Sequence, residues 1–189
     1  MTISLWLKPT TVSDNRLLVS KWNHVSKTSY LLFFVAGNLA ITLSSETDGY
    51  GYKTFSVPYT KNINEWAQIT MVYTAASGRA EFFINGVSVG KSADFAMPTS
   101  IANTDASFVI GTRENQDALF EGGIDDVRIW SSSLTNDDIR ELYKHPQKLS
   151  NSPFLQGYWK FNGNLNDESG NGNNLSSSLG AVFSNDVPF

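Results

Sequence analysis

One stretch of the chain changes its hydrophobic period part-way along, and this constrains the fold more than any other feature. Residues 122–130 (Gly-Gly-Ile-Asp-Asp-Val-Arg-Ile-Trp) have the roughly alternating apolar pattern of a short β-strand. From Leu134 the apolar spacing becomes helical, and Thr135 followed three residues later by Asp138 is a capping-box pattern. The sequence therefore predicts a strand that leads into one short helix near residues 135–144.

The rest of the chain is a series of short strand-like runs separated by turns. Asn85-Gly86 lies between two β-rich runs and favours a tight type I′ hairpin turn, because both residues tolerate positive φ. Short strands at this spacing with a single helix predict an all-β fold, a two-sheet antiparallel jelly-roll sandwich. The predicted strands are 3–8, 17–22, 30–35, 39–44, 55–59, 66–74, 81–84, 87–89, 107–111, 124–130 and 158–161, and Glu46–Tyr52 is predicted to be a loop.

Four stretches together resemble the laminin-G-like, concanavalin-A-like jelly-roll family, to which the pentraxins are related. Residues 122–143 are similar to its closing strand and helix, and Met1–Pro9 to an early core strand. Trp66–Tyr73 with Ala80–Gly90 is similar to its central hairpin, and Phe154–Leu175 to its opening strand and loop. The resemblance covers most of the chain and implies the same sandwich fold.

The order of these stretches differs from the family's order, because the opening strand stands at the C-terminal end. We expect one domain over residues 1–189, with 145–153 resembling a linker. Residues 154–189 either fold back into the first-strand position, as in a permuted domain, or begin a further repeat. The family's second strand has no counterpart here, which predicts an open sheet edge that could pair with a second copy or a neighbouring domain.

Composition excludes several classes of function. The net charge of −4 argues against nucleic-acid binding, which would favour a basic face. No apolar run approaches the ~20 residues that cross a bilayer, and no signal peptide is visible, so we expect no membrane insertion. The chain has no cysteine, which leaves the compartment open. The resemblance implies an extracellular or cell-surface location.

Catalysis is not expected. Glucanases that share this sandwich carry a Glu-x-Asp-x-Glu run, which places alternate carboxylates in one cleft. The chain has no such run. We therefore predict that it is not an enzyme.

Calcium is the candidate cofactor, in a structural role. Residues 167–174 (Asp-Glu-Ser-Gly-Asn-Gly-Asn-Asn) are dense in oxygen donors of the kind that Ca²⁺ prefers. The resemblance implies that this loop meets the closing strand, so the predicted ligands are Asp125, Asp167 and Asn171. The alternative is a solvated Asn/Gly turn. A weaker candidate, from the resemblance to pentraxins, is the pair Glu114 and Asp117.

Sugar binding needs aromatic faces together with planar polar partners. Four tryptophans lie in strand patterns and are expected to pack in the core or on a sheet: Trp6, Trp66, Trp130 and Trp159. The remaining aromatic and polar loop residues are the candidate ligand-binding residues: Trp22, Tyr50, Tyr52, Arg113 and Asn115.

Two functions remain open at this stage, with a degenerate relative of the glycoside hydrolases as a third, minor hypothesis. The resemblance implies a non-catalytic module of a larger protein that binds a glycan or another cell-surface ligand. The alternative is a structural or protein–protein interaction repeat without glycan binding, because one fold can serve many functions.

Overall fold

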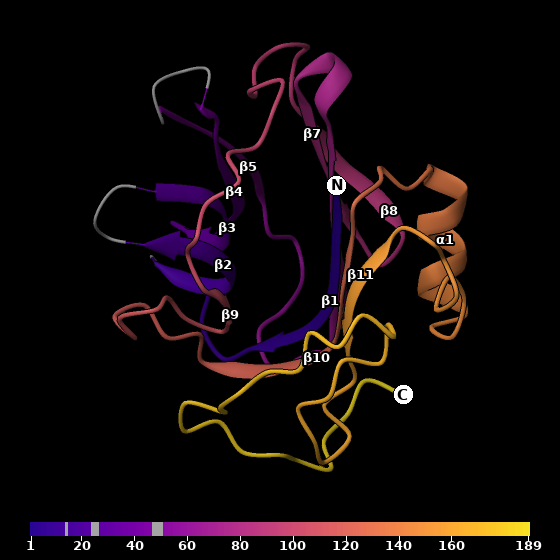
Figure 1. Cartoon of the computed structure of the whole chain (residues 1–189). Coiled ribbons are helices and arrows are strands. Elements are labelled where there is room, and N and C mark those ends of the chain that lie inside the picture. The colour runs from indigo at the N-terminus through magenta and orange to yellow at the C-terminus, as the bar shows by residue number, and fades with distance from the viewer. Residues whose placement is uncertain (14, 24–26, 47–50) are drawn as a thin grey trace.

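The computed structural model describes residues 1–13, 15–23, 27–46 and 51–189, which form two antiparallel β-sheets packed face to face (Figure 1). This confirms the predicted jelly-roll sandwich. The six-stranded sheet has the order β11 (Leu155–Trp159), β10 (Gly122–Trp130), β1 (Thr2–Pro9), β6 (Ala67–Thr74), β7 (Arg79–Ile84) and β8 (Val87–Lys91). The five-stranded sheet has the order β5 (Tyr52–Pro58), β4 (Asn38–Ser44), β3 (Lys27–Val35), β2 (Arg16–Asn23) and β9 (Phe108–Ile110).

The core fills the space between the two sheets with residues that alternate along each strand. Ile3, Leu5 and Leu7 of β1 are fully buried and contribute to this core together with Phe34 of β3 and Ile41 of β4. Period-two alternation sends every second side chain to the same face, so short apolar runs are sufficient to build each layer. The predicted strands are confirmed with small shifts in their ends. Tyr52 is an exception, because it begins β5 and does not lie in a loop.

The paired acids of β10 form a bulge, which explains the irregular alternation in that run. Ser4 pairs with Arg128 and Trp6 with Asp125, so β10 has one more residue than β1 between these two pairs. Asp126 takes the left-handed conformation, with φ of 53°. The extra residue keeps the apolar side chains before and after the bulge on the core side of the sheet.

The helix α1 (Asn136–Lys144) covers the outer face of the six-stranded sheet (Figure 1). Its predicted capping box is confirmed: the Thr135 hydroxyl accepts from the backbone N–H of Asp138, whose carboxylate accepts in return from the N–H of Thr135. Ile139 packs on β6 and β7, and Leu142 packs beside Trp130. The region around β10 is therefore buried on both faces, and the tryptophan of this strand is 0% exposed.

The Asn85–Gly86 turn also forms as predicted, with φ of 51° and 76°. A β-carbon at Gly86 would lie 3.2 Å from Tyr143 Cβ, so the tip of the hairpin packs closely against α1. None of the helices in the described part of the chain is both long and apolar enough to cross a bilayer.

The two sides of the sandwich close in different ways. At the β5 and β8 side, Gly90 packs directly against Val57, so the sheet edges approach closely. At the other side β11 pairs antiparallel with β10, and the Trp159 indole stacks on the Phe108 ring of β9 with centroids 4.9 Å apart. The strand predicted at residues 158–161 begins three residues earlier, at Leu155. This second side leaves a groove between the two sheets.

Candidate functional site

The structure brings two of the predicted ligand-binding residues together on the outer face of the five-stranded sheet. The Arg113 guanidinium lies over the Trp22 ring, 5.9 Å from its centroid. Trp22 packs in a small apolar cluster with Leu17, Leu31 and Ala118, and its buried indole N–H has no hydrogen-bond partner among the described residues. Most of the Trp22 side chain therefore packs against the sheet.

The other predicted residues are spread along the same sheet. Tyr52 is 66% exposed at the start of the edge strand β5, where it pairs with Ser44. Two strands, β3 and β4, separate it from the strand of Trp22. Asn115 is exposed in the segment after β9, and Tyr50 lies outside the described residues. Neither of the two hollows described below is lined by a described member of this set.

The Asn- and Gly-rich loop of residues 166–174 runs along the free edge of β11. Both oxygens of the Asp167 carboxylate accept hydrogen bonds: Oδ1 from the backbone N–H groups of Tyr158 and Ser169, and Oδ2 from the Ser169 hydroxyl and the Asn173 N–H, all at 2.8–2.9 Å. Burial alone would raise the pKa of Asp167, but these donors outweigh it and hold the pKa below its ordinary value.

The same loop satisfies backbone groups of β11 that a neighbouring strand would otherwise pair. The Asn171 amide donates to the Leu155 carbonyl at 2.8 Å, and the Asn173 amide donates to the Gln156 carbonyl at 2.7 Å. The Glu168 N–H donates to the Tyr158 carbonyl. An unpaired strand edge invites association with other chains, so this loop protects the β11 edge of the six-stranded sheet.

Calcium binding remains a prediction. The described residues contain no group of three His, Cys, Asp or Glu side chains that could hold a metal ion together. Asp125 is 8% exposed, and its Oδ1 accepts from the Asp126 N–H at 2.8 Å. In the weaker candidate pair, Glu114 accepts from the Ser107 hydroxyl and Asp117 lies 3.5 Å from Arg113.

A buried ionic network lies next to Asp125 on the outer face of the six-stranded sheet. Arg128 is 1% exposed and donates to Asp126 at 3.0 Å and to the Tyr158 hydroxyl at 2.5 Å, with its guanidinium also 4.0 Å from the Tyr158 ring centroid. Asp125 forms no ion pair with a described residue, and burial raises its pKa from 3.8 to about 6.

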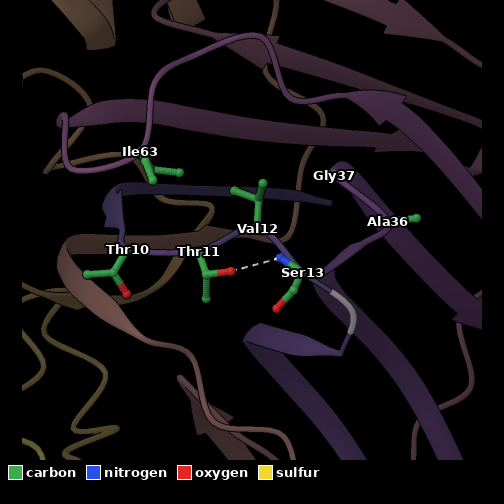
Figure 2. Close-up of a pocket in the computed structure, with 7 residues that line it drawn as sticks. All are labelled: Thr10, Thr11, Val12, Ser13, Ala36, Gly37 and Ile63. Atoms are coloured by element: carbon green, nitrogen blue, oxygen red, sulfur yellow. Dashed lines mark hydrogen bonds between the residues drawn. The ribbon is translucent and has the colours of Figure 1, made fainter.

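One surface hollow lies at the end of the sandwich near the β3–β4 turn (Figure 2). Figure 2 shows that Thr10, Thr11 and Ser13 line it together with Val12 and Ile63, and that the Thr11 hydroxyl accepts from the Ser13 N–H. Its lining has no aromatic ring and no charged group among the described residues. It offers little that would orient a ligand.

The groove on the β9 and β11 side has the composition of a ligand site, with a volume of about 400 Å³. Its apolar floor comes from both sheets: Phe108 from β9, and Ile129 and Trp159 from β10 and β11. A side chain at Gly157 would overlap the Trp159 indole, so the glycine allows this ring to fold back over its own strand. The indole N–H donates to the Asn173 carbonyl at 2.9 Å, which fixes the ring.

The rim of this groove carries several polar groups. The Tyr30 hydroxyl is protonated at neutral pH, as a tyrosine ordinarily is, and burial raises its pKa further, to about 12. None of the described residues hydrogen-bonds to it. The other polar rim residues are Lys21, Gln156, Asn173, Asn174 and Ser176. Sequence reasoning missed this set, since its members come from separate segments. The one sequence signal that could have indicated part of the groove is the Gly-x-Trp spacing at residues 157–159, which allows an indole to fold over a glycine.

The family model for the concanavalin A-like lectin/glucanases superfamily matches residues 1–140. The chain belongs to this superfamily. The match ends within α1, so β11 and the loop of residues 166–174 lie beyond the part shared with the superfamily model.

The proteins to which this chain is similar differ widely in the share of their own length that the match covers. The adhesion G-protein coupled receptor V1 of Danio rerio is 26% identical over 149 residues, which is 78% of this chain and 2% of the receptor. A protein of Bacteroides ovatus assigned to carbohydrate binding has a TM-score of 0.65 at 17% identity, covering 86% of this chain and 45% of that one. A carbohydrate-binding module of a Ruminococcus gnavus sialidase, bound to sialyllactose, has a TM-score of 0.59 at 18% identity, covering 75% and 80%.

Asp167→Asn should lower the free energy of unfolding by about 2 kcal/mol, because the new amide turns a donor toward groups that are themselves donors. The measurement is urea denaturation in EDTA buffer. Glu168→Gln, in the same loop, should change stability by less than about 0.5 kcal/mol. Equal stability of Asp167→Asn and the wild type would show that the carboxylate does not hold the loop.

Asp125→Asn should stabilise the fold at neutral pH. Because the folded pKa of about 6 lies above the ordinary 3.8, the stabilisation from the protonated carboxyl is complete below about pH 4 and is lost as the pH rises through 6. In EDTA at pH 7.5 the variant should therefore unfold with a free energy on the order of 1–2 kcal/mol higher than the wild type, with the difference vanishing near pH 4. The exposed Glu46→Gln variant controls for the lost charge, and a difference that does not vary with pH would contradict this account.

Proposed function

We propose that the chain is a non-catalytic carbohydrate-binding module and that the sugar binds in the groove between β9 and β11. The groove carries this proposal because it combines an aromatic floor with convergent polar groups, whereas the Thr- and Ser-lined hollow has no aromatic ring. The apolar C–H face of a sugar ring can lie on the Phe108 ring, and the rim amides can hydrogen-bond its hydroxyl groups.

The composition of the groove also supports a binding role without catalysis. Glycoside hydrolysis generally needs two carboxyl groups on either side of the scissile bond. None of the described residues that line the groove is acidic, and none is a histidine. The groove can therefore hold a saccharide through stacking and hydrogen bonds but offers no acid–base pair.

The comparisons favour the same class of function. Two of the similar structures are described by their ability to bind carbohydrate, one of them with a sialylated sugar bound. A further similar structure is a domain of an extracellular arabinanase in complex with arabinotriose. By analogy we place this chain outside the cell or on its surface, as one module of a larger protein.

A second candidate function is adhesion through protein contacts. The relative from Danio rerio is an adhesion receptor, which favours a repeat whose surfaces contact other proteins. Such a module would self-associate or bind a neighbouring domain through a sheet edge. Sedimentation velocity over a range of concentrations would detect this association, and a monomer at all concentrations would speak against it.

Binding to a glycan array should identify oligosaccharides whose affinity falls about tenfold or more in Phe108→Ala, because that ring supplies the stacking surface. Arg113→Ala and Tyr52→Ala, from the set on the outer sheet face, should bind as the wild type does. Thermal melts of each variant control for folding. Loss of binding in the outer-face variants with full binding in Phe108→Ala would move the site to that face, and silence of the whole array would reject the proposal.

We also propose a structural calcium ion at Asp125, with Asp167 and Asn171 as further ligands. The desolvated carboxylate of Asp125 forms no ion pair with a described residue, which supports an ion there, although Arg128 is near enough to lower its pKa in part. Asp167 would have to exchange existing hydrogen bonds for the metal. Adding Ca²⁺ to EDTA-treated protein should raise the melting temperature by several degrees, and Asp125→Asn should abolish the rise. An unchanged melting temperature would reject the ion.

A further inference from the structure

Lys21 occupies an unusual place for a charged residue, on the core-facing side of a strand. It pairs with Phe108 of β9 on one side and with Tyr30 of β3 on the other, and Tyr30 in turn pairs with Leu43 of β4. Cross-strand partners point to the same face of a sheet, and the aromatic residues and Leu43 of this row pack against the core. The lysine stem therefore runs toward the interior, and its ammonium group emerges at the rim of the groove.

No acidic side chain in the described part of the chain neutralises the positive charge of Lys21. Lys21 forms no ion pair with any described residue, and no acidic residue of the described chain lines the groove. The chain as a whole has a net charge of −4, so the positive charge in the groove is opposite in sign to that of the whole molecule. A cation held beside a low-dielectric aromatic floor attracts an anion more strongly than one in open water.

The Tyr30 hydroxyl adds a second free donor in the same row. Like an ordinary tyrosine hydroxyl it is protonated at neutral pH, and it lies opposite Lys21, so it can donate to an anionic oxygen that also faces Lys21. Hydrogen bonds that involve a charged group are roughly twice as strong as neutral ones. The two neighbouring positions therefore form a donor pair at one end of the stacking surface.

We propose that the groove selects oligosaccharides that carry an anionic group, a carboxylate or a sulfate ester, and that Lys21 determines this preference. The inference rests on the proposed sugar-binding function of the groove. The sugar ring lies on Phe108 and the anionic group faces Lys21 and Tyr30. The amide side chains of the rim contact the neutral hydroxyl groups.

The test uses isothermal titration of the whole chain with three forms of one disaccharide: neutral, with a hexuronate in place of the hexose, and sulfated. The anionic forms should bind at least about tenfold more tightly than the neutral form at 50 mM NaCl, with the advantage shrinking at 300 mM. Lys21→Met should remove this advantage, and Lys21→Arg should retain it. If only one of the two anionic forms is preferred, the result identifies whether the groove selects a carboxylate or a sulfate ester.

Lys53→Met is a matched control, because Lys53 pairs with Leu43 in the same row but on the edge strand β5, three strand spacings or about 14 Å from Lys21. It should leave every affinity unchanged. If the neutral form binds as tightly as the anionic forms and Lys21→Met binds all three equally well, the charge preference is refuted while sugar binding stands. If none of the three forms binds and the glycan array is also silent, the sugar-binding function itself is refuted.

Discussion

The pairing of β11 with β10, secured by the loop that follows it, is the interaction on which the candidate site depends. Backbone pairing alone stabilises a five-residue strand at a sheet edge only weakly, because half of its backbone groups have no strand partner. The Asp167 carboxylate and the Asn171 and Asn173 amides supply those partners from within the same loop. This arrangement holds Trp159 and the 173–176 segment in place, and both of them line the groove.

Contacts on the outer face of the six-stranded sheet explain why the edge strand β11 can be so short. Helix α1 buries Trp130 and Leu155 on that face, and Arg128 joins Asp126 to the Tyr158 hydroxyl. β11 is therefore held by apolar contacts and an ionic network in addition to its backbone pairing. Removing one partner from such a buried network costs more than an exposed ion pair would, since the remaining charge loses its compensation.

The groove arises because the sandwich closes asymmetrically. On the β5 and β8 side, a glycine lets the two sheets approach directly, whereas on the other side they are separated by two stacked aromatic rings. The space beside those rings is open to solvent and collects side chains from both sheets. Lys21 reaches it because β2 lies next to the short edge strand β9, and Tyr30 reaches it from β3, one strand further from that edge.

The sequence by itself determined the local structure and the class of fold. The capping box at Thr135, the turn at Asn85–Gly86 and the alternating runs each depend on neighbours within a few residues, so their patterns are readable without coordinates. Tertiary structure alone decided the site, because Lys21, Phe108 and Trp159 are far apart in the chain and converge only through strand order. It also decided which groups donate to the Asp167 carboxylate, because the sequence of an oxygen-rich, glycine-rich turn does not show that the backbone N–H of Tyr158, on the neighbouring strand, lies against it.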